Sequence, residues 1–160
     1  MTSNRNLALA ALAAALIAIP GCGDDDSTTG GDDSAKADFI AQADEICTQT
    51  GATVTAEAQK QFPSGVAPAE GKEIDRFFAE VTIPALRDQF EQIAALTPPP
   101  GDEDEIQAIV DAGNEAVDQV EKDPASLAVL KGAKTPFDEV TQLEQAYGFQ
   151  VCGAEDPDPS

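Results

Sequence analysis

The residues that can do chemistry in this chain are few in kind. Its 160 residues include three cysteines, Cys22, Cys47 and Cys152, and 30 aspartates and glutamates, but no histidine. Histidine is the usual general base near neutral pH and a common metal ligand, so Ser-His-Asp and Cys-His catalytic centres and His-bearing zinc sites are excluded. We therefore assign no catalytic, cofactor-binding or metal-binding residue and expect a protein that is not an enzyme.

Cys22 lies at the border between an apolar segment and an acidic one. The apolar run covers residues 7–19, Arg5 precedes it, and three consecutive aspartates begin at Asp24. As a helix, a run of this length reaches roughly 20 Å, whereas the hydrocarbon core of a bilayer is about 30 Å thick. A basic start, a short apolar run and small residues at its end are typical of an export signal.

The residues Ile19-Pro20-Gly21-Cys22 resemble the lipobox of bacterial lipoproteins, although Pro20 stands where alanine, serine or threonine is commoner. The resemblance implies that residues 1–21 are a signal peptide cleaved before Cys22 and that the Cys22 sulfur carries a diacylglycerol. Two fatty chains give stable anchoring where one gives reversible binding. The resemblance thus places the chain at the outer face of the cytoplasmic membrane. The alternative is an ordinary secretory signal in which Cys22 is incidental.

The other two cysteines, Cys47 and Cys152, are predicted to form a disulfide. An exported chain folds in a compartment that favours disulfides. Closing a loop of about 100 residues contributes roughly 4.7 kcal/mol in the chain-entropy model. A redox-active pair is the weaker alternative, because neither cysteine lies in a CxxC motif.

By composition, the exported part of the chain is divided into three segments. Residues 22–34 are rich in glycine and aspartate and are predicted to be the lipidated cysteine with a flexible acidic linker. Residues 35–153 are predicted to be one helical domain, and residues 154–160 a disordered acidic tail. The formal net charge of −21 argues against nucleic acid as a partner, because phosphates would be repelled. The charge either selects cationic partners or simply keeps the protein soluble.

Apolar residues recur at steps of three and four along the domain, so the predicted class is all-α. We expect helices over 38–62, with Cys47 on the inner face, and over 69–96, kinked or divided at Pro84. A third helix follows Asp102, which with Glu105 resembles a capping box. A short helix follows Asp123, and the last begins at Thr135 and ends at Gly148. Short loops favour an antiparallel bundle of about four helices, tied by the disulfide.

Three stretches, ADEIC, IPALRDQFEQIAALTPPPGDE and PFDEVTQLEQAYGFQVCG, are similar to segments of small lipoproteins and secreted proteins of actinobacteria. The resemblance covers residues 37–153. It implies a Gram-positive type of envelope and supports the pairing of Cys47 with Cys152. Because that group has no established activity, it implies no catalytic residue here.

These observations favour a non-catalytic domain that binds an envelope protein or a cell-wall component. One alternative is a helical domain that binds a lipid or small ligand in a pocket lined by Phe77, Phe78, Phe90, Phe137 and Phe149. The weakest alternative is a carboxylate-based enzyme acting on glycans, since the chain has no tryptophan and one tyrosine for sugar binding. Arg76 and Arg87 are expected to form ion pairs within their own helix.

Overall fold

The computed structural model describes residues 29–68, 71–127 and 134–154 of the chain. Cys22, the predicted signal peptide and residues 155–160 of the predicted tail therefore lie outside the described residues. Every regular element within the described ranges is helical, which confirms the predicted all-α class. The elements are α1 (Thr29–Gln61), α2 (Lys72–Phe77), the π-helical segment η1 (Phe78–Thr82), α3 (Ile83–Ala95), α4 (Glu103–Lys122), the 3-10 turn η2 (Pro124–Leu127) and α5 (Asp138–Tyr147).

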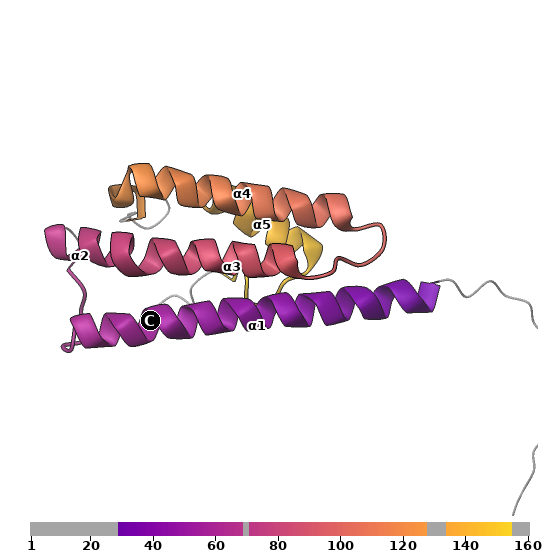
Figure 1. Ribbon diagram of the computed structural model, residues 1–160, viewed down its shortest axis with the longest axis horizontal. Coiled ribbons are helices and arrows are strands. Elements are labelled where there is room, and N and C mark those ends of the chain that lie inside the picture. The colour runs from indigo at the N-terminus through magenta and orange to yellow at the C-terminus, as the bar shows by residue number, and fades with distance from the viewer. Residues whose placement is uncertain (1–28, 69–70, 128–133, 155–160) are drawn as a thin grey trace, which may run out of the picture.

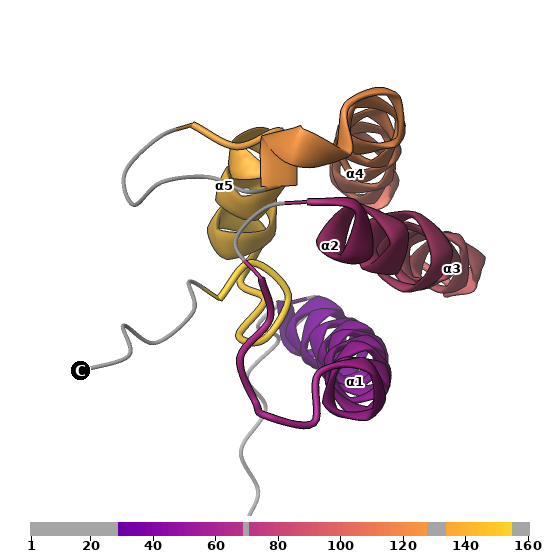
Figure 2. The same cartoon turned by 90° about the vertical axis from the view of Figure 1, so that its left-hand side faces the viewer.

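The helices pack around α3. Figure 1 shows α1, α3 and α4 lying along a common direction, and the view in Figure 2 shows α3 between α1 and α4. α3 contacts both of these helices, and α5 packs against α4. α1 and α3 run in opposite directions, as do α3 and α4. Since α3 is covered on two sides, its apolar face and those of its neighbours form one continuous interior.

α1 is longer than the sequence pattern predicts. It begins at Thr29, inside the segment 22–34 that composition assigns to a flexible linker, and it continues through Gly51 without interruption. Carboxylates near the start of a helix are stabilised by the partial positive charge of the free N–H groups. The aspartates that make this segment too polar for a core are thus compatible with a helix start. Composition alone does not distinguish a flexible acidic linker from the acidic start of a helix.

The helical run from α2 to α3 is interrupted close to Pro84, as predicted. The Ile83 N–H donates to the carbonyl oxygen of Phe78, five residues earlier, so the turn before the proline is π-helical. Pro84 has no N–H to give to the preceding turn. The wider turn is a common way for a helix to absorb such a break. The result is one helical run, from Lys72 to Ala95, that contains a single π-helical turn before Pro84.

The interior consists of a main cluster and a smaller one. The six largest fully buried side chains come from α1, α3 and α4: Phe39, Phe90, Ile93, Ile109, Val117 and Val120. The smaller cluster, Phe62, Ile74 and Phe77, joins the end of α1 to α2. Phe39 of α1 belongs to the main cluster, and Phe62, the residue after α1, belongs to the smaller one. The two clusters therefore lie along the same helix.

The segment that follows α5 is bonded to the middle of α1. Cys47 of α1 and Cys152 form a disulfide with their Cα atoms 5.5 Å apart, as the predicted pairing requires. Gly148 ends α5 in the left-handed conformation with φ 114°. This turn brings Phe149 back onto the core, where 4% of its surface is exposed. Cys152 is thereby directed towards α1.

α5 begins at Asp138, three residues later than the predicted start at Thr135, and no side chain caps it at Phe137. The Thr135 hydroxyl accepts the N–H of Phe137 at 3.1 Å and donates to Asp138 at 2.7 Å. The bonds that Thr135 gives to Asp138 lower the pKa of this carboxyl group and fix the first turn of α5. The short helix expected after Asp123 is the 3-10 turn η2, and residues 128–133 that follow it lie outside the described residues.

Gly113 sets how closely α3 and α4 approach, and its replacement is expected to destabilise the fold. A Cβ atom at Gly113 would overlap the ring of Phe90, so Gly113→Ala should cost about 1–3 kcal/mol through overpacking. Gly51→Ala is the matched control, because Gly51 lies in α1 with no atom near the added methyl and should gain about 0.5–1 kcal/mol. Chemical denaturation measures both. Equal stability of the two variants would contradict this packing.

Candidate functional site

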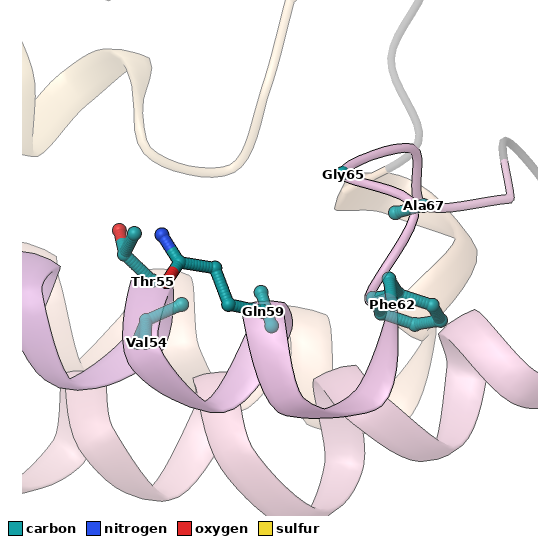
Figure 3. A pocket seen from close by; sticks show the side chains of 7 residues that line it. Val54, Thr55, Gln59, Phe62, Gly65 and Ala67 are labelled. Atoms are coloured by element: carbon teal, nitrogen blue, oxygen red, sulfur yellow. The ribbon is translucent and has the colours of Figure 1, made fainter.

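A cavity of about 350 Å³ lies at the C-terminal end of α1, beside the loop that leads towards α2 (Figure 3). The loop folds back because the Gly65 N–H donates to the Phe62 carbonyl oxygen at 2.9 Å and Gly65 has a φ of 76°. The cavity is lined by residues from the end of α1 and from the loop: Val54, Thr55, Ala58, Gln59, Phe62, Gly65 and Ala67.

The cavity has an apolar floor and a polar, uncharged rim. Val54, Ala58 and Phe62 recur at intervals of four and belong to the smaller apolar cluster. Thr55 and Gln59 are exposed and project on the same side of α1 (Figure 3). Pockets of about 300–1,000 Å³ with apolar walls and a few polar groups are typical of small-molecule sites. The arrangement suits a small neutral ligand with an apolar body and one hydrogen-bonding group.

The aromatic stripe predicted to line such a pocket does not line this one. Phe77, Phe90 and Phe149 are buried in the two apolar clusters, and the phenylalanine of the cavity is Phe62. Helical periodicity identifies the face that turns inward, but it contains no information about where packing leaves a gap. The gap depends on the fold of the loop 62–68, which has no periodic signal.

Asp44 anchors residues 150–152, which follow α5, a role that sequence reasoning missed. Its carboxylate accepts the backbone N–H groups of Gln150, Val151 and Cys152 at 2.8–3.2 Å. Successive N–H groups that converge on one anion form a strong local binding site. Asp44 therefore holds the same segment that the disulfide attaches to α1.

Glu144 lies beneath this segment and is 4% exposed, which is rare for a glutamate. Burial, and next the negative charge of Asp44, raise the pKa of Glu144 from 4.5 to about 7. The folded protein thus holds a proton on Glu144 under mildly acidic conditions. The environment of Glu144 became known only from the structure.

A polar cluster of Lys36, Asp102 and Tyr147 joins α1 to the start of α4 and to α5. The Tyr147 hydroxyl donates to Asp102 at 2.7 Å, and Lys36 Nζ lies 3.7 Å from the same carboxylate and 3.8 Å from the centre of the tyrosine ring. Burial, followed by the bond to Asp102, raises the pKa of Tyr147 above its ordinary value of 10. The tyrosine is neutral at physiological pH, and the cluster has a structural role.

This cluster corrects the predicted capping box of Asp102 with Glu105. The Asp102 side chain makes no capping hydrogen bond to α4, because its carboxylate accepts the hydroxyl of the buried Tyr147. A buried phenol needs an acceptor, and this requirement cannot be seen in the local sequence.

The expected ion pairs of the two arginines need a similar correction. Arg76 lies 3.9 Å from Glu80 within its own helical run, as predicted. Arg87 instead reaches across to α4, where it pairs with Asp118 and Glu121 at 2.9 Å each. The close approach of α3 and α4 brings these acids nearer to Arg87 than a same-helix prediction assumes.

Comparison of the chain with protein-family models, with curated proteins and with solved structures gives no match. Across residues 29–68, 71–127 and 134–154, no helix has the length and apolar character needed to cross a membrane. The same residues contain no group of three or more Cys, Asp or Glu side chains arranged to hold a metal ion. The resemblance to actinobacterial lipoproteins stays a prediction.

Glu144 is expected to make the protein less stable as the pH rises. Because the pKa of Glu144 is raised on folding, its contribution is complete below about pH 4.5 and is lost as the pH passes 7. The free energy of unfolding should fall by about 2–3 kcal/mol between pH 5 and 8, and Glu144→Gln should remove most of this fall. Glu139→Gln, on the same helix but exposed, should not. Urea unfolding across this pH range would refute the assignment if both variants behaved alike.

Proposed function

We propose that the protein is a membrane-anchored extracytoplasmic lipoprotein whose helical domain is a non-catalytic binding module for an envelope protein or cell-wall component. In this proposal residues 1–21 are the signal peptide and Cys22 carries the lipid. The domain acts as an antiparallel helical bundle, tied by its disulfide, at the outer face of the cytoplasmic membrane.

The observation that carries the proposal is the bond between Cys47 and Cys152. It accounts for two of the three cysteines and leaves Cys22, which follows the apolar run and the lipobox-like residues. A buried disulfide also suits a protein that folds in an oxidising compartment. The disulfide and the lipobox-like sequence are independent features that support the same location.

The position of α1 supports a tethered module. α1 begins at Thr29, seven residues after Cys22, and seven residues span at most about 25 Å. α1 has 33 residues and is therefore about 50 Å long. Its start is close to the proposed anchor, whereas the cavity lies at its far end. A binding site in that place is accessible from outside the membrane.

The anchor is tested by replacing its sulfur. The wild-type protein, expressed in a Gram-positive host, is expected to enter the detergent phase of a Triton X-114 extract, and its intact mass should show loss of residues 1–21 and addition of a diacylglycerol. Cys22→Ala should stay in the aqueous phase. The matched control is the double variant Cys47→Ser and Cys152→Ser, which loses the disulfide but should still be lipidated. An unmodified thiol at Cys22 in the wild type would refute the proposal.

Binding of a small neutral ligand is a second candidate function, and the cavity at the end of α1 favours it. The cavity has a suitable size and a mixed lining without charges. A carboxylate-based enzyme has no such support, because no acid is among the described residues that line the cavity.

Filling the cavity is expected to weaken this binding. The neutral probe N-phenyl-1-naphthylamine should bind the wild type with a saturable fluorescence increase. Ala67→Phe places a ring in the cavity and should weaken binding at least about tenfold. Ala56→Phe adds the same ring at an exposed position of α1 outside the lining and should leave binding unchanged. Equal affinity of both variants, with their fold verified by circular dichroism, would place the probe elsewhere.

A further inference from the structure

We propose that Asp44 is a positioning residue that holds Cys152 in place for its bond to Cys47. The Asp44 carboxylate binds the backbone N–H groups of residues 150–152 while both cysteines are still thiols, so that oxidation locks a turn that already exists. This role depends neither on the membrane anchor nor on the cavity. It rests on the geometry of Asp44, on the surroundings of the Cys152 sulfur, and on the exposure of the turn.

Asp44 and Cys47 lie three residues apart on α1 and therefore on the same face of the helix. The Asp44 carboxylate accepts the N–H groups of Gln150, Val151 and Cys152 at 2.8–3.2 Å. None of these bonds uses a sulfur atom, so they can form in the reduced protein. The turn held in this way places the Cα atoms of the two cysteines 5.5 Å apart, within the range of about 4.4–6.8 Å that a disulfide requires.

The buried position of Cys152 also suits a thiol. Its Sγ lies 3.3 Å from the Ala43 carbonyl oxygen. A thiol hydrogen at this place would have an acceptor, although S–H is a weak donor. Reduction therefore does not leave the Cys152 side chain without a polar partner, and the reduced side chain can stay in its buried place against α1.

Hydrogen bonds, more than burial, hold the turn to α1. The buried ring of Phe149 fixes the chain up to the start of the turn, but residues 150–151 are exposed. Gln145 Nε2 adds one hydrogen bond, to the Gly153 carbonyl oxygen at 2.7 Å. The charge-assisted bonds to Asp44 are stronger than such a neutral bond. Loss of the Asp44 carboxylate should therefore release the reduced turn while the helices stay packed.

The oxidation itself is a thiol–disulfide exchange with a disulfide oxidant such as oxidised glutathione. One protein thiolate attacks a sulfur of the oxidant and releases one glutathione thiolate, which takes up a proton. The second protein thiolate then displaces the second glutathione from the mixed disulfide. The protein dithiol loses two electrons and two protons, and the oxidant becomes two glutathione thiols. Because the cysteines are 105 residues apart in sequence, the turn on Asp44 replaces a long-range search by a short-range encounter.

The first test measures how readily the disulfide forms. The full chain with Cys22→Ala, whose only thiols are Cys47 and Cys152, is equilibrated in detergent with mixtures of reduced and oxidised glutathione. The oxidised fraction gives the effective concentration of the thiol pair. Asp44→Ala should lower this concentration at least about tenfold, because bonds to a charged acceptor are lost and the reduced turn leaves α1. Asp38→Ala removes the same charge from an exposed position of α1 and should leave the concentration unchanged.

A second measurement observes the turn without the bond. Hydrogen exchange is followed on the full chain carrying Cys47→Ser and Cys152→Ser. The amides of residues 150–152 should exchange slowly in this double variant. Adding Asp44→Ala should speed their exchange about tenfold, while the amides of α3 and α4 stay protected. A general structural role of Asp44 would instead lower protection in these helices as well.

Three results would overturn the positioning role. The first is an equal effective concentration in Asp44→Ala and Asp38→Ala. The second is fast exchange of residues 150–152 in the double serine variant, which would mean that the turn forms only after the bond. The third is loss of protection across α3 and α4 when Asp44→Ala is added, which would make Asp44 a support of the whole fold. Since none of these measurements uses the lipid or the cavity, their failure leaves the proposed function untouched.

Discussion

The attachment of the segment that follows α5 to the middle of α1 is the constraint on which this structure depends. α5 has α4 as its main packing partner among the helices. The bond from Cys47 to Cys152 and the N–H groups on Asp44 add a covalent and a polar connection to α1 at one place. They close the arrangement of helices into a unit in which α1 cannot separate from the end of α5 without breaking both.

The acidic residues of this chain have several distinct roles. A net charge of −21 indicates a well-solvated surface, and most carboxylates among the described residues are exposed. Asp44 and Asp102, in contrast, accept hydrogen bonds that join distant parts of the chain. Glu144 is buried, and burial raises its pKa. Counting charges cannot separate these roles, because each depends on which backbone or side-chain groups the fold brings to the carboxylate.

The helical class, the break near Pro84, the end of α5 at Gly148 and the cysteine pairing were predictable, because each follows from local periodicity, from proline and glycine geometry, or from export chemistry. The long-range partners of side chains were not predictable from the sequence. The cross-helix pairing of Arg87 and the bond from Tyr147 to Asp102 depend on how closely the helices approach. The cavity was missed for the same reason, since it is produced by a loop whose shape no periodic pattern encodes.

The early start of α1 limits where a partner can be. If Cys22 is lipidated, seven residues separate the bilayer from a rigid helix, so the domain samples a shallow layer and not a large volume. Such confinement raises the local concentration of the domain for anything else held in that layer. Weak contacts would then suffice with neighbours that are themselves membrane-bound, whereas freely diffusing molecules would need higher intrinsic affinity.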